Sequence, residues 1–104
     1  INKFEQLHDL TDNNIIIGDF NFADKDIDRG KGKMFNKDKV IYPIWENFKT
    51  QKGIIDPYRR KYPNQVCFSY IAPTGKSRGD RVYINEENTS SFTNFEYIHI
   101  YLLI

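Results

Sequence analysis

Hydrophobic positions follow two different periods along the chain. The run Ile15-Ile16-Ile17 is continuous and β-branched, which is typical of a buried central strand, and Gly18 permits a sharp exit from it. Farther along, apolar side chains recur at helical spacing, at Val40, Ile41, Ile44, Trp45 and Phe48. Gly53 follows at the place where glycine commonly ends a helix, whereas Pro43 belongs in a first turn or marks a kink. The pattern therefore predicts a strand over residues 15–18 and then a helix whose first residue it does not define.

The rest of the chain alternates between polar segments and further strand patterns. Residues 1–10 resemble the end of an amphipathic helix, and residues 22–38 form a long loop rich in Lys, Asp and Gly. Residues 66–71 and 78–84 are rich in strand formers and are expected to pair as a hairpin. Residues 95–104 are apolar on both faces, as expected of a strand covered on both sides. These elements predict a single α/β domain.

Composition supports a packed domain and selects no partner. The chain has 104 residues, of which 39% are hydrophobic and 15% aromatic, and its net charge is +1. Such a composition argues against disorder. Its one cysteine excludes an internal disulfide, and no apolar run approaches the ~18 residues of a membrane span. No signal peptide is visible, and both ends look cut, so residues 1–104 are expected to be a domain truncated at both ends.

Basic residues gather in two places. One cluster follows the first predicted strand, at Lys31, Lys33, Lys37 and Lys39, and the other is Arg59-Arg60-Lys61. Taken singly, each cluster is interpreted as solvated loop charge.

The strongest candidate for chemistry is the segment Gly18-Asp19-Phe20-Asn21 behind the first strand. An acid can take or orient a proton, and an amide can donate to a phosphate oxygen. The competing interpretation is an ordinary strand-to-turn junction, because Asp and Asn are turn residues in any case.

Three short segments occur in a fixed order along the chain. They are residues 15–21 (IIIGDFN), 55–64 (IDPYRRKYPN) and 77–84 (SRGDRVYI). Together they resemble the C-terminal half of the endonuclease/exonuclease/phosphatase superfamily, the DNase I-like fold. The resemblance is closest to the apurinic-type endonucleases of non-LTR (LINE-type) retrotransposons and their DNA-repair relatives. It implies roughly the C-terminal half of an α/β/β/α sandwich with a mostly antiparallel sheet, and metal-dependent cleavage of phosphate esters.

The resemblance also implies roles for individual residues. Asp19 matches the acid that orients or deprotonates the attacking water, and Asn21 matches the amide that holds a phosphate oxygen; both belong to the metal site. Asp80 matches an acid that orients a catalytic histidine. Arg78 is placed either to bind the DNA substrate or simply to be solvated. The implied cofactor is Mg²⁺ or Mn²⁺, and the implied partner is DNA, with no membrane and no small-molecule cofactor.

The chain also departs from the family pattern. The principal metal-binding glutamate of the family belongs to an N-terminal half that is absent here, and its catalytic histidine lies beyond the last predicted strand. His99 is not that histidine, because no Ser-Asp precedes it. Gly79 replaces a usually aliphatic residue beside Asp80, where glycine weakens a strand. Asp56 and Arg59 match a family pair that we interpret as structural.

These observations predict metal-dependent phosphodiester hydrolysis of DNA, of the retrotransposon or apurinic endonuclease type, with the chain inactive by itself. Whether the chain is itself an enzyme stays open. The alternatives are a non-catalytic remnant of a retroelement, or another phosphoesterase of the superfamily, such as a deadenylase or a lipid or inositol phosphatase. A retroelement origin implies the nucleus. For the site, we expect Asp19, Asn21 and Asp80 to meet at one end of the sheet.

Overall fold

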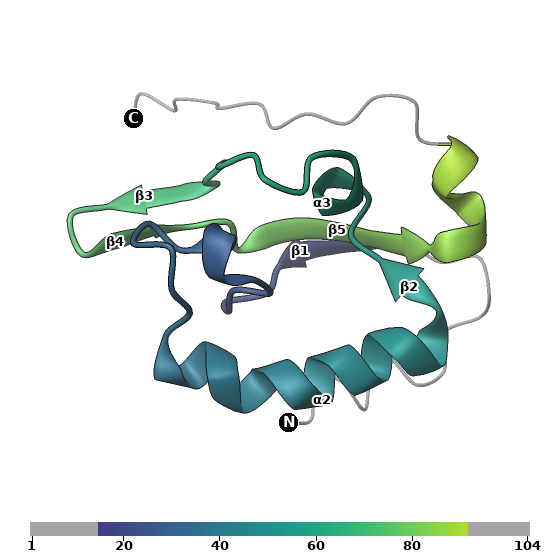
Figure 1. Cartoon of the computed structure of the whole chain (residues 1–104), viewed down its shortest axis with the longest axis horizontal. Coiled ribbons are helices and arrows are strands. Elements are labelled where there is room, and N and C mark those ends of the chain that lie inside the picture. The colour runs from purple at the N-terminus through teal and green to yellow at the C-terminus, as the bar shows by residue number, and fades with distance from the viewer. Residues whose placement is uncertain (1–14, 92–104) are drawn as a thin grey trace.

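The computed structural model describes residues 15–91, so the helix expected over 1–10 and the strand expected over 95–104 lie outside it (Figure 1). The described strands are β1 (Ile15–Asp19), β2 (Ile54–Ile55), β3 (Tyr70–Ala72), β4 (Gly75–Ser77) and β5 (Asp80–Asn85). The helices are α2 (Asn36–Lys52), α3 (Pro57–Lys61) and the short 3-10 helices η1 (Asp26–Asp28) and η2 (Glu86–Ser91). The described part is a small mixed helix and sheet domain with antiparallel sheets, which is compatible with the expected α/β class.

The main sheet has the strand order β1-β5-β2, and both strand pairs are antiparallel. Within residues 15–91, β5 is therefore the central strand and β1 lies at an edge. The expectation that residues 15–18 are buried is wrong, because Ile15 is 63% and Ile17 is 74% exposed. Of the three isoleucines at residues 15–17, only Ile16 packs against the core. A continuous apolar run identifies a strand, but it does not say how many of its faces are covered.

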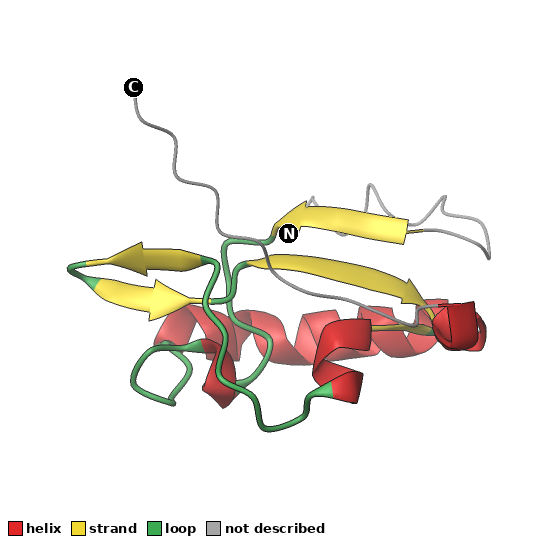
Figure 2. Cartoon of the chain, turned by 90° about the horizontal axis from the view of Figure 1, so that it is seen from above, coloured by secondary structure: helices red, strands yellow, loops and turns green. Residues whose placement is uncertain are grey.

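Helix α2 runs along one side of this sheet (Figures 1 and 2). Two of its side chains, Trp45 and Phe48, belong to the core cluster. Trp45 is fully buried, stacks on Phe48 with ring centroids 5.5 Å apart, and meets Tyr83 of β5 edge to face at 5.0 Å. Such aromatic pairs stabilise beyond the area that they bury. The core thus joins the helix to the middle of the sheet.

The two ends of α2 follow from local chemistry. Asp38, in the first turn, accepts a hydrogen bond from the backbone N–H of the N-cap residue Phe35 at 2.7 Å. The helix therefore begins before its first apolar position, and the expected loop ends before residue 36 instead of at residue 38. Pro43 lies inside the helix. Gly53 ends it with φ of +62°, the left-handed conformation that favours glycine, which confirms the predicted C-terminal cap.

The expected hairpin between residues 66–71 and 78–84 is wrong in its pairing. Strand β3 pairs with β4, with Tyr70 opposite Ser77, and β5 pairs with β1 and β2 instead. The chain leaves the small β3–β4 sheet after Ser77 and enters β5 at Asp80. Arg78, between the two strands, belongs to neither of them, and its side chain is buried in the interior. Figure 2 shows the β3–β4 hairpin projecting past the end of the main sheet.

Candidate functional site

Asp19, Asn21 and Asp80 come together at one end of the main sheet. Asp19 is the last residue of β1 and lies opposite Asp80, the first residue of β5. The backbone N–H of Asn21 donates to Asp19 Oδ1 at 2.9 Å. All three residues line one cavity of about 390 Å³. The predicted convergence is confirmed, while the roles of the three residues stay predictions.

The turn that carries Asp19 and Asn21 is held by its apolar neighbours. Phe22 is buried and Phe20 is half-buried, and both rings pack against Trp45, at 5.8 and 5.4 Å between centroids. Asn21 has φ of +59°, a left-handed conformation that asparagine tolerates better than most residues. The two phenylalanines therefore anchor the turn from within, and the polar side chains of Asp19 and Asn21 are left exposed.

Gly79 lies directly beside the carboxylate of Asp19. A Cβ atom added at Gly79 would lie 3.0 Å from Asp19 Oδ1. The backbone carbonyl of Gly79 also accepts from the N–H of Phe20 at 2.9 Å, and the N–H of Asp80 donates to Ser69 Oγ at 3.1 Å. Glycine at position 79 therefore makes room for Asp19, and hydrogen bonds on both sides hold Asp80 in place.

The rim of this cavity is basic. Lys37 at the start of α2 and Lys76 of β4 are exposed lining residues. Arg29 also lines the cavity, but its guanidinium is bound by both oxygens of Asp38, at 2.8 Å each. Of the basic residues that line this cavity, the two lysines are thus the ones whose charge is not bound by Asp38, and they share the cavity with Asp19 and Asp80.

Oxygen ligands for a cation are present but few. Within residues 15–91, no group of three or more His, Cys, Asp or Glu side chains is arranged to hold a metal ion. Mg²⁺, however, is commonly held by one or two carboxylates, with waters and substrate phosphates completing its coordination. The carboxylate of Asp19 and the amide oxygen of Asn21, the two residues predicted to hold the metal, fit that limited demand.

Arg78 lies in a different place from the one expected of a DNA-binding residue. It is fully buried, its Nε donates to Asp28 Oδ1 at 2.7 Å, and its Nη2 donates to Asp56. Burial alone would lower the pKa of Arg78, but the hydrogen bonds and charges of Asp28 and Asp56 raise it. The structure therefore places Arg78 inside the domain, and both expectations for it, contact with the substrate and exposure to solvent, are corrected.

Asp56 and Arg59 belong to the same buried network and are structural, as expected. Asp56 caps α3 by accepting from the N–H of Arg59 at 3.1 Å, and Arg59 Nη2 donates to Asp28 at 2.8 Å. Asp28 is the member that sequence reasoning missed. It is one of several acids in a polar loop, and nothing in its local pattern separates it from the others.

Arg81 was also missed. It is 1% exposed, and its Nη1 donates to the carbonyls of Phe22 and Arg78. It thereby ties the turn that carries Asn21 to the start of β5. The strand alternation that puts Tyr83 on the core face puts Arg81 there too, and this was the available signal.

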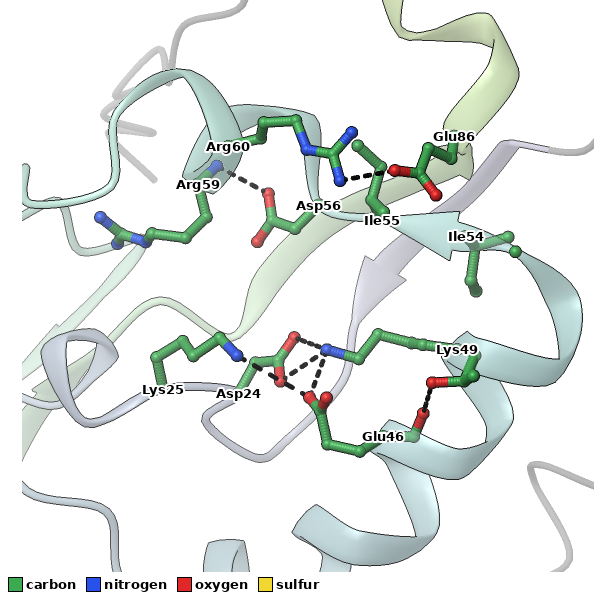
Figure 3. Close-up of a pocket in the computed structure, with 12 residues that line it drawn as sticks. Asp24, Lys25, Glu46, Lys49, Ile54, Ile55, Asp56, Arg59, Arg60 and Glu86 are labelled. Atoms are coloured by element: carbon green, nitrogen blue, oxygen red, sulfur yellow. Dashed lines mark hydrogen bonds and ion pairs between the residues drawn. The ribbon is translucent and has the colours of Figure 1, made fainter.

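A second cavity, of about 430 Å³, opens between α2 and the segment from β2 to α3 (Figure 3). Figure 3 shows two groups of charged side chains facing each other, one around Lys49 and one around Arg60. Lys49 Nζ lies 3.0 Å from Asp24 and 2.6 Å from Glu46, and Arg60 lies 2.9 Å from Glu86. These charges neutralise one another, so the cavity resembles a structural charge cluster more than a binding site.

The titration of the Lys49 group agrees with that interpretation. Burial alone would lower the pKa of Lys49, but the charge of Asp24 and the hydrogen bond to Glu46 raise it. Burial would likewise raise the pKa of Asp24, but Lys49 and the Tyr83 hydroxyl lower it. Both groups are therefore held in their charged forms.

Comparison with known proteins leaves the family undecided. The sequence matches no protein-family model and no curated protein. Of the helices between residues 15 and 91, none is long and apolar enough to cross a membrane. The feature of this chain that bears on its function is therefore the geometry around Asp19, Asn21 and Asp80.

Proposed function

We propose that this chain contributes one half of a metal-dependent phosphodiesterase site that hydrolyses DNA, within a DNase I-like α/β/β/α sandwich. The observation that supports the proposal is the meeting of Asp19, Asn21 and Asp80 at one sheet end, although Asp80 is distant from the other two in sequence. The lysines at the rim add to it, because a site for phosphodiesters needs cations near its acids.

The chemistry assigns a separate task to each residue. A phosphodiester is a poor electrophile surrounded by negative charge, so its hydrolysis needs an oriented nucleophile and donors directed at the developing charge. Asp19 would orient and deprotonate the attacking water, and the Asn21 amide would donate to a phosphate oxygen. A divalent cation, when bound by Asp19 and Asn21, would supply Lewis-acid stabilisation. Asp80 would orient a histidine supplied from outside residues 15–91.

The chain alone is expected to bind DNA but to hydrolyse it poorly. The resemblance assigns the principal metal-binding glutamate and the catalytic histidine to parts of the family's domain that have no match in this chain. Loss of a single charge-stabilising donor can lower a rate by ~10²–10³-fold. Plasmid nicking in Mg²⁺ should therefore be slow or undetectable.

A binding experiment tests the proposal without depending on turnover. The chain is titrated in Mg²⁺ against a fluorescein-labelled DNA duplex and, in a separate titration, against the labelled single strand alone. Asn21→Gly removes the amide and suits the left-handed backbone at this position, and it should weaken binding by roughly tenfold or more, since a hydrogen bond to a charged group contributes about 1.5–3 kcal/mol.

Asn47→Ala, at an exposed position of α2, is the matched control and should leave binding unchanged. The proposal fails if the chain binds neither form of DNA. It also fails if Asn21→Gly binds DNA as tightly as the Asn47→Ala control and the unmodified chain do.

A further inference from the structure

Two exposed aromatic rings line the same cavity as the acid pair. Phe35, the N-cap of α2, is 46% exposed, and Tyr70 of β3 is 58% exposed. They come from different elements, and neither belongs to the core cluster around Trp45. Exposed aromatic surface beside a polar cavity is typical of a binding site, because such rings bury apolar area when a ligand arrives.

The ring of Phe35 is fixed before any ligand binds. The guanidinium of Arg29 lies over it, 4.0 Å from the ring centroid, and Asp38 holds that guanidinium by two hydrogen bonds. The N–H of Phe35 donates to the same carboxylate at 2.7 Å. Stacking of a ligand on Phe35 therefore involves little further loss of side-chain conformational entropy.

Two lysines share the cavity with these rings. Lys37 and Lys76 line the same cavity as Phe35 and Tyr70. Aromatic rings that bind bases, together with basic side chains that follow the backbone, are the usual composition of sites for single-stranded nucleic acid. A base in an intact duplex is stacked between its neighbours, so only an unpaired or extruded base can reach such rings.

We propose that this cavity binds an unpaired nucleobase of a DNA strand, stacked on Phe35 or Tyr70, with the adjoining phosphate near Lys37 and Lys76. The cavity of about 390 Å³ is within the usual size of small-ligand sites, ~300–1,000 Å³, and so suits a single nucleotide. The inference rests on the proposed function and narrows its substrate to single-stranded or locally unpaired DNA.

The experiment compares three probes with the full chain in Mg²⁺. They are a 12-nucleotide single strand with 2-aminopurine at its centre, the same strand annealed to its complement, and the same strand with an abasic position at the centre. We expect the single strand to bind at least tenfold more tightly than the duplex, and the 2-aminopurine fluorescence to fall on binding. Stacking of one base on an aromatic ring supports an expected loss of roughly five- to hundredfold in affinity for Tyr70→Leu or Phe35→Leu.

Tyr42→Leu is the matched control, because Tyr42 is an exposed aromatic residue of α2 outside this cavity. Tyr70→Leu alters only an exposed strand position and keeps the test valid if Phe35→Leu unfolds. Equal affinity for duplex and single strand, or unchanged binding by Tyr70→Leu and by a folded Phe35→Leu, overturns this inference and leaves the proposed function standing. Failure of every DNA probe to bind overturns both.

Discussion

Single residues decide the geometry of the candidate site, and Gly79 is the clearest case. Its missing side chain leaves the space that Asp19 Oδ1 occupies, 3.0 Å from where a Cβ would lie. Asp19 in turn accepts from the N–H of Asn21. One missing methyl group therefore affects both members of the predicted catalytic turn.

Gly79→Ala should displace the Asp19 carboxylate by a few tenths of an ångström and weaken DNA binding in Mg²⁺. Asp19 is exposed and can rotate away, so we expect the free energy of unfolding to change by less than about 1 kcal/mol. The displacement is read from the chemical shift of the Asn21 amide. Gly18→Ala is the control, since an added Cβ there meets nothing within 4 Å. Equal Asn21 shifts in both variants would contradict the assigned role of Gly79.

Arg78 gives a second prediction at this scale. Arg78→Met should lower the free energy of unfolding by about 3–5 kcal/mol, because it leaves the buried carboxylates of Asp28 and Asp56 without their shared cation. Urea unfolding measures the loss. Arg60→Met is the control, because Arg60 and Glu86 form a pair with side chains 50% and 61% exposed, and such pairs contribute about 0–1 kcal/mol. Similar losses in the two variants would show that the buried network is not what stabilises the start of β5.

At the scale of elements, the N-terminus of α2 is held by one carboxylate. Asp38 accepts from the N–H groups of Ala23 and Phe35 and binds Arg29. Burial alone would raise the pKa of Asp38, but the hydrogen bonds from Arg29 and the backbone lower it below its ordinary value of 3.8. This residue thus connects the helix to the loop that follows the turn carrying Asp19 and Asn21.

The lowered pKa sets the pH dependence of stability. Because the folded pKa lies below the unfolded value, the contribution of Asp38 is complete above pH 3.8 and is lost as the pH falls through the folded pKa. The melting temperature should therefore fall as the pH drops from 4 to 2. Asp38→Asn should melt lower than the unmodified chain at pH 7 and show a shallower fall. An equally steep fall in Asp38→Asn would place the acid sensitivity elsewhere, for example at Asp24, whose pKa is lowered by Lys49.

At the scale of the whole molecule, the sheet has one face on the core and one that is partly bare. Ile16 packs toward Trp45, whereas Ile15 and Ile17 on the opposite face of β1 are exposed. In the sandwich that we propose, a second sheet would cover this face. The chain alone should therefore bind a dye for apolar surface and tend to aggregate.

The double variant Ile15→Thr/Ile17→Thr should reduce dye binding and raise solubility with little change in the free energy of unfolding. Ile16→Thr is the control and should cost about 1–3 kcal/mol, because it puts a hydroxyl against the aromatic core. The measurements are dye fluorescence, the soluble fraction at rising concentration, and urea unfolding. Unchanged dye binding in the double variant would show that this face is not the exposed apolar surface of the chain.

The sequence by itself determined the elements whose causes are local. The β-branched run at residues 15–17 marked a strand, helical spacing and Gly53 marked the body and end of α2, and Asp19 with Asn21 marked the turn. Strand propensity, the glycine cap of α2 and turn formation at these places depend on neighbours a few residues away, which the sequence displays directly. The meeting of Asp80 with that turn was also predictable, but only through the order of the three segments.

Only the tertiary structure decided which distant groups meet. Arg78 reaches Asp28, fifty residues away, and so becomes an internal ion pair instead of a substrate contact. The same inward turn separates β4 from β5 and overturns the expected hairpin. Removing a guanidinium from water is strongly unfavourable, so it is buried only where carboxylates bind it. No local sequence pattern shows which loop will supply those carboxylates.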